Sequence, residues 1–202
     1  MIADLADIGI NPKVKCCTWP AGFLSTISWR GSCDYNPDAM ACRGVLFAIT
    51  QEEAQRLQAA CGNDTAVLSI VQDEIEEAWD ETHLCQTDKA WDAIHRCLDD
   101  GTLATGKSLL TLCILGGEQL HKGDSYIVSL LTAERVKQVA KALGPLDEAW
   151  FRDRYFQIDP NDYALQLCEQ DFEYTWAYFE GVREFYEKAA AENRWTIFTV
   201  DQ

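Results

Sequence analysis

The residues best suited to chemistry lie in the segment TDKAWDAIHRCL, residues 87–98. If this segment is a helix, His95 lies one turn from Trp91 and two turns from Asp88. A histidine beside a carboxylate can act as a general base or contact a phosphate. Asp88, Trp91 and His95 are therefore candidate residues of a ligand-binding cleft.

The same segment also allows a purely structural interpretation, which we favour. His95 would lie at the edge of the packed face, with its polar edge satisfied by Asp88. A His–Asp pair without a serine or cysteine nucleophile at a suitable spacing is an incomplete catalytic arrangement. Trp91 falls on the apolar side of the helical projection, and the solvent side holds Lys89, Asp92 and Arg96, with Asp92 and Arg96 spaced as an ion pair.

A second candidate position is the turn ILGGEQLHKGD, residues 114–124. Gly116 and Gly117 would allow a ligand or partner to approach the backbone closely, and Glu118 adds a carboxylate. These residues complete the candidate cleft. The segment lacks the glycine spacing of phosphate-binding loops, as does ATGKS at residues 104–108, so a turn that ends a strand is the favoured interpretation.

Metal binding is suggested only by the triplets HLC and HRC, residues 83–85 and 95–97. Structural zinc needs four converging nitrogen or sulfur ligands. Residues two apart on a helix point in nearly opposite directions, and the sequence contains no C-x-x-C. We therefore predict no metal site and no cofactor.

The charge balance restricts the class of partner. With 17 basic and 33 acidic residues the net charge is −16 at pH 7, which argues against binding to nucleic acid or to an anionic membrane. It favours either a basic protein partner, such as a toxin, or simple solubility. The candidate partner-binding residues are Glu173, Glu180, Glu184 and Glu187.

Cysteine usage and the N-terminus indicate the compartment. The nine cysteines are odd in number, scattered and mostly set in apolar runs, which is typical of reduced thiols in a core. The N-terminus lacks the basic flank and apolar core of a signal peptide. We predict a cytoplasmic protein.

The elements that must position these residues indicate an α+β fold. A β-prone run at residues 43–49 leads into a capping box formed by Thr50 and Glu53. We expect a small mixed or antiparallel sheet packed against several helices. Further strands are predicted at 108–117, 125–132 and 195–200, and helices at 51–62, 65–81, 87–98, 133–143, 146–156 and about 169–193.

The long C-terminal helix is rich in aromatic residues. Its apolar arc spans roughly 200° at 100° per residue, and glutamates occupy the opposite side. Such a stripe is more often core than ligand site. The arc contains Phe172, Tyr174, Trp176, Tyr178, Phe179, Val182, Phe185 and Tyr186.

The chain divides at about residue 40. Residues 1–39 hold three of the five prolines and show little periodicity, so they are either an irregular N-terminal arm or an extension upstream of a natural start at Met40. Residues 40–202 are predicted to form a single domain.

Several segments together resemble the YfbM-like family of bacterial proteins, a domain of unknown function. They are CRGVLFAIT, TDKAWDAIHRCL, LGGEQL, YIVSLLTAERVKQVAKAL and DFEYTWAYFEGVREFYEKAA. The match runs from about Cys42 to the C-terminus. The resemblance implies a compact α+β domain of bacterial or phage origin, and it implies no reaction or cofactor.

Two hypotheses of function follow. The favoured one is a non-enzymatic acidic binding protein, most concretely an immunity or antitoxin-like protein that covers a basic surface on a bacterial effector. The alternative is a small enzyme or ligand sensor with a polar cleft beside the helix that carries Trp91 and His95.

Overall fold

A computed structural model describes residues 42–104, 106, 108–123 and 125–201. The prediction of an arm or extension at residues 1–39 lies outside these residues. The elements below belong to one compact unit.

The centre of the fold is a five-stranded sheet in which every neighbouring pair is antiparallel. The strand order is β2-β1-β5-β4-β3, so the last strand of the chain lies in the middle of the sheet. The prediction of an α+β fold with a small sheet is confirmed. The strands are β1 (Gly44–Ile49), β2 (Leu84–Asp88), β3 (Glu118–Gln119), β4 (Tyr126–Leu131) and β5 (Trp195–Asp201).

The first strand passes directly into a helix through the predicted capping box. The Thr50 hydroxyl accepts from the Glu53 amide at 3.2 Å, and the Glu53 carboxylate accepts from the Thr50 amide at 2.7 Å. Both bonds satisfy amides that the first helical turn leaves unpaired. Helix α1 (Gln51–Ala60) ends just before Gly62, whose φ of +91° suits glycine.

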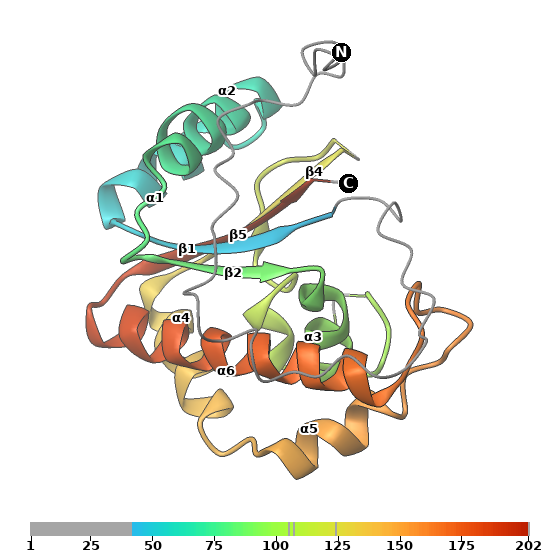
Figure 1. The fold of residues 1–202 in the computed structure, drawn as a ribbon. Coiled ribbons are helices and arrows are strands. Elements are labelled where there is room, and N and C mark those ends of the chain that lie inside the picture. The colour runs from blue at the N-terminus through green and yellow to red at the C-terminus, as the bar shows by residue number, and fades with distance from the viewer. Residues whose placement is uncertain (1–41, 105, 107, 124, 202) are drawn as a thin grey trace, which may run out of the picture. The chain divides into compact units, whose positions relative to one another are not determined.

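The helix predicted over residues 65–81 is shorter and less regular than expected. It consists of α2 (Asp64–Leu68) followed by a π-helical segment, η2 (Ser69–Glu76). Val67, Val71 and Ile75 are nevertheless buried against the sheet, as the apolar spacing predicted. Figure 1 shows α1 and α2 on one side of the sheet.

The opposite face of the sheet is covered by the remaining helices (Figure 1). Thr132 caps α4 at the predicted position, and the long C-terminal helix runs close to its predicted bounds. The helices are α3 (Ala90–Leu98), α4 (Ala133–Leu143), α5 (Glu148–Tyr155) and α6 (Glu169–Ala191).

The strand predicted at residues 108–117 was wrong. This segment forms a short 3₁₀ turn, η3 (Leu110–Cys113), and only Glu118–Gln119 pair with β4. The Thr111 hydroxyl donates to the Ser108 carbonyl at 2.7 Å, which holds the turn. A short apolar run cannot by its spacing alone distinguish a strand from a buried turn of helix.

Two apolar clusters fill the space on the two faces of the sheet. Successive residues of β1 alternate between them: Leu46 joins the cluster under α3–α6, and Phe47 joins the one under α1 and η2. On α6 the buried aromatics are Phe172, Phe179, Phe185 and Tyr186. At roughly 1.5–3 kcal/mol per buried aromatic side chain, α6 is a principal stabilising element.

Candidate functional site

Asp88 and Trp91 do not occupy one continuous helix. Asp88 is the last residue of β2, with a left-handed φ of +45°, and its carboxylate lies 3.5 Å from the Nε of Arg43. Trp91 lies in α3, where its indole N–H donates to the Cys42 carbonyl at 3.1 Å and its ring packs against Phe198. The prediction that Asp88 belongs to the first turn of the helix was therefore wrong.

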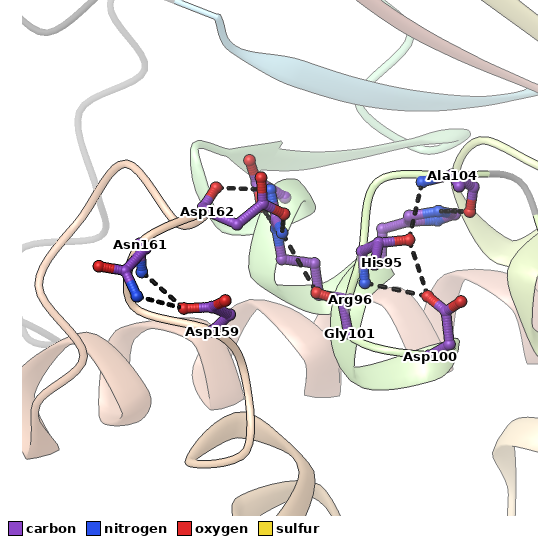
Figure 2. A network of polar contacts seen from close by, with 10 residues as sticks. His95, Arg96, Asp100, Gly101, Ala104, Asp159, Asn161 and Asp162 are labelled. Carbon is purple, nitrogen blue, oxygen red and sulfur yellow. Dashed lines mark hydrogen bonds and ion pairs between the residues drawn. The ribbon is translucent and has the colours of Figure 1, made fainter.

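His95 lies beneath the chain that follows α3, as Figure 2 shows. Its side chain is fully buried, and its Nε2 lies 3.4 Å from the Ala104 carbonyl oxygen. Among the described residues its Nδ1 has no hydrogen-bond partner. Burial lowers the pKa of His95, so the neutral ring is favoured. The predicted pairing with Asp88 is absent because that residue ends a strand and interacts with Arg43 instead.

Arg96 was predicted on the solvent side of α3, and this was wrong. Its side chain is 3% exposed, and all three guanidinium nitrogens donate hydrogen bonds. Nε bonds Asp92 at 2.5 Å, the i,i+4 pair that the sequence predicted. Nη1 bonds the Asp162 carboxylate at 2.6 Å and the Gly101 carbonyl at 3.2 Å, and Nη2 bonds the Asp162 carbonyl at 3.1 Å (Figure 2).

Two tyrosines extend this arrangement to α6. The hydroxyls of Tyr155 and Tyr163 both donate to one carboxylate oxygen of Asp171, at 2.5 and 2.8 Å. Burial raises the pKa of Asp171, and the two hydroxyl donors oppose that shift. The Arg96 guanidinium lies 5.9 Å from the centre of the Tyr163 ring. We call the whole set the α3 network: Asp92, Arg96, Tyr155, Asp162, Tyr163 and Asp171.

The α3 network fits a structural role better than a catalytic one. It joins α3 to α5, to the chain after α5 and to the start of α6, so it fixes how these elements pack. Each nitrogen of the Arg96 guanidinium already has a protein acceptor, so binding a substrate anion would require breaking an existing bond.

The glycines of the second candidate position approach the protein's own backbone. A Cβ at Gly117 would lie 2.5 Å from the Ser129 hydroxyl, and the Gly117 amide donates to that hydroxyl at 3.0 Å. Gly116 likewise packs closely against the backbone of Thr111. Glu118 is exposed in β3, opposite Leu130. The close approach that glycine allows is therefore used to seat β3 beside β4.

The glutamates predicted to bind a partner form a line along the outer side of α6. All four are exposed, and at 100° per residue they fall within an arc of about 60°. At 1.5 Å per residue the line is about 20 Å long. We call Glu173, Glu180, Glu184 and Glu187 the α6 stripe.

Basic side chains near the α6 stripe are engaged elsewhere. Arg183 donates to the Leu146 carbonyl at 2.7 Å, and Lys188 donates to the Thr82 carbonyl at 2.6 Å. Within residues 42–201, apart from the three positions not described, no stripe glutamate forms an ion pair. The stripe is therefore exposed negative charge without a basic counterpart in this part of the chain.

Glu76 is a partly buried acid that sequence reasoning missed. The sequence placed it only within the helix predicted over residues 65–81, but it accepts a hydrogen bond from the Tyr126 hydroxyl and another from the Thr199 hydroxyl at 2.9 Å. Burial raises the pKa of Glu76, and these donors oppose the shift. The only sequence signal was its position next to buried Ile75, and π-helical geometry turns it toward the sheet.

Thiols and potential metal ligands are dispersed in the described chain. Cys97 and Cys113 are buried free thiols, whereas Cys61 is exposed. Burial raises the pKa of Cys85 to about 12. Among the described residues, no group of three His, Cys, Asp or Glu side chains is placed to hold a metal ion.

Comparison with known proteins identifies the family of the chain. The sequence model of a family described as "Domain of unknown function (DUF1877)" matches residues 40–199. The fold is similar to the crystal structure of YfbM from Escherichia coli, itself described as a protein of unknown function. That match has a TM-score of 0.57 and 18% identity, and covers 78% of this chain and 99% of YfbM.

These matches confirm the resemblance to the YfbM-like family that the sequence indicated. A comparison with curated proteins found no match. Among the described residues, no helix is both long and apolar enough to span a membrane.

Proposed function

Since the chain belongs to the family described as Domain of unknown function (DUF1877), we propose from its own surface that it is a non-catalytic binding protein whose α6 stripe receives a basic protein partner. The finer form of this proposal is an immunity or antitoxin-like protein that neutralises a bacterial effector. In that role the acidic face would cover a cationic surface that the effector needs for its own activity.

The observation that carries the proposal is that the glutamates of the α6 stripe are exposed, whereas the neighbouring basic side chains of α6 are hydrogen-bonded within the protein. The four stripe glutamates point outward, whereas Arg183 and Lys188 are bonded to backbone carbonyls. A row of uncompensated carboxylates produces a field that attracts a cationic surface and speeds encounter at low ionic strength. Partner association should therefore weaken as salt rises.

The alternative function, a small enzyme or ligand sensor, receives less support. It required Asp88 and His95 to converge beside Trp91, but Asp88 interacts with Arg43 and His95 is buried beneath Ala104. Arg96, the residue after His95, already bonds two carboxylates. A substrate would have to displace these contacts.

The test uses the full chain as bait in an extract of its native host, at low and at high salt. A captured basic protein would then be purified and its affinity measured for two variants. The first carries Gln at all four stripe positions. The matched control removes four exposed acids elsewhere: Glu52→Gln, Glu81→Gln, Glu148→Gln and Asp153→Asn.

Both variants lose the same net charge, so they separate a local effect from a general one. We expect the stripe variant to bind at least tenfold more weakly and the control to bind nearly as well as the wild type. Equal loss in both variants, or no partner at either salt concentration, would overturn the proposal.

A further inference from the structure

Among the described residues, the His95 side chain forms one hydrogen bond, to the turn that follows α3. The turn Gly101–Ala104 follows α3 and folds back so that the Ala104 carbonyl faces Nε2 of the imidazole (Figure 2). The ring is fully buried, and its Nδ1 finds no partner among the described residues. A carbonyl can only accept, so Nε2 carries the hydrogen and Nδ1 keeps a lone pair.

This environment fits the neutral ring and does not fit the imidazolium. A protonated ring has two N–H donors and a full positive charge, and the closed turn offers an acceptor to only one of them. A buried charged donor without a partner is strongly unfavourable. Protonation would therefore require the ring to reach water or a new acceptor.

The carboxylates around His95 already accept hydrogen bonds from other groups. Asp92 accepts from Arg96, the Asp99 carboxylate accepts from the Gly106 amide at 2.9 Å, and Asp100 accepts from Thr102. Asp92, Asp99 and Asp100 attract a positive ring, and Arg96 repels it. From α5, Arg154 donates to the carbonyls of Cys97 and Asp99, which places a second cation beside the turn.

The turn itself is attached mainly by polar contacts. The Gly101 carbonyl accepts from Arg96, and the Gly101 amide donates to the Arg96 carbonyl at 3.2 Å. Inside the turn, the Thr102 and Ala104 amides bond the side chains of Asp100 and Thr102. Leu103 is exposed rather than packed in the core. Opening the turn would therefore expose little apolar surface.

We propose that the turn Gly101–Ala104 is a pH-sensitive latch, closed while the His95 ring is neutral and opened when that ring takes up a proton. The latch belongs to the α3 side of the molecule and does not depend on the α6 stripe. It would couple the exposure of the segment after α3 to a fall in pH.

The direction in which pH changes the stability of the closed turn follows from the lowered pKa of His95. Burial lowers the pKa of His95 in the closed state, so the open state binds the proton more readily. The latch is fully stable above the ordinary histidine pKa of about 6.5 and weakens as the pH falls below it. A single site can raise the opening constant up to about tenfold per pH unit.

The test is amide hydrogen exchange between pH 5 and pH 8, with each rate corrected for its intrinsic pH dependence. We expect protection at Gly101, Thr102 and Ala104 to fall several-fold below about pH 6.5 in the wild type. His95→Phe, which cannot titrate, should remove this dependence. His83→Gln, at a histidine whose Nε2 lies 3.0 Å from the Glu192 carboxylate just after α6, should leave it unchanged.

A direct measurement on the wild type covers the case in which His95→Phe does not fold. The imidazole nitrogen shifts of His95 should report an Nε2–H tautomer with a pKa below the ordinary value of about 6.5. A ring that titrates near 6.5 while the protection of the turn stays constant would overturn the proposal.

Discussion

The α3 network and the α6 stripe handle charge in opposite ways. In the network, Arg96 is almost completely buried and bonds Asp92 and Asp162, and two tyrosines satisfy Asp171. In the stripe, four glutamates point to solvent and none has a basic partner in the described chain. Both regions are rich in carboxylates, but the network is built around a buried, paired guanidinium and the stripe is exposed.

The difference follows from the cost of desolvation. A buried charge that is not paired and hydrogen-bonded destabilises the folded protein. An exposed carboxylate carries no such cost, because water solvates it. Paired buried groups therefore indicate how the protein holds together, and unpaired exposed groups indicate where another molecule could bind. Residue type alone would have suggested the reverse, because His95 and Arg96 look more like site residues than surface glutamates do.

The largest expected effect comes from removing the centre of the α3 network. Arg96→Met keeps an apolar stem but leaves Asp92 without its ion-pair partner in a partly buried position. We expect the free energy of unfolding to fall by about 3 kcal/mol, as for the loss of one partner of a buried pair. Urea denaturation measures this difference.

Asp162→Asn is the matched control for that change. The Asp162 side chain is 60% exposed, so its loss of charge should cost at most about 1 kcal/mol. If the two variants were equally destabilised, burial would not be what distinguishes the network from the stripe.

Glu76 extends the comparison to the other face of the sheet. Glu76→Leu leaves the hydroxyls of Tyr126 and Thr199 without their acceptor and should cost roughly 1–3 kcal/mol. Glu76→Gln keeps a carbonyl acceptor and should cost clearly less. Thermal and urea unfolding of the two variants would separate lost hydrogen bonding from lost charge.

The burial of Glu76 also predicts that the free energy of unfolding depends on pH. Burial raises the folded-state pKa of Glu76, so its contribution to stability is full below the ordinary value of about 4.3 and is lost as the pH rises through the raised pKa. Glu76→Gln should flatten this part of the curve of unfolding free energy against pH. An unchanged curve would mean that Glu76 is as well solvated as a stripe glutamate.

The smallest effect on stability is expected at the α6 stripe. Replacing all four glutamates by glutamine should change the unfolding free energy by no more than about 0.5 kcal/mol per site, because exposed positions contribute little. Glu180 and Glu184 are like charges one turn apart, so the change should be slightly stabilising at low salt. Strong destabilisation would show that the stripe supports the fold.

Local signals predicted much of the fold. The capping box at Thr50 and Glu53, the cap at Thr132 and the apolar arc of α6 each depend on neighbours within a few residues, and each is confirmed. The run at residues 108–117 failed because its spacing suits both a strand and a buried turn, and the hydrogen bonds of Thr111 favour the turn.

The candidate cleft depended on positions that local rules do not fix. Asp88 and His95 would have been neighbours only if α3 had begun before Asp88, but that residue pairs with Gly44 of β1 in the sheet. The helical projection alone predicted that the Arg96 side chain is exposed to solvent. In the structure it is buried, and it pairs with Asp162, which is distant in the sequence. The spacing of residues 87–98 predicts neither the pairing of Asp88 with Gly44 nor the ion pair between Arg96 and Asp162.

The sequence by itself determined most of the helices, the first and last strands, the acidic balance and the family, because these follow from short-range periodicity, composition and ordered motifs. Only the tertiary structure decided which charges are buried and paired, which remain exposed on α6, and that His95 lies under Ala104 rather than beside Asp88. The physical reason is that the desolvation of a side chain depends on segments distant in the chain, which pack over it only when the fold closes.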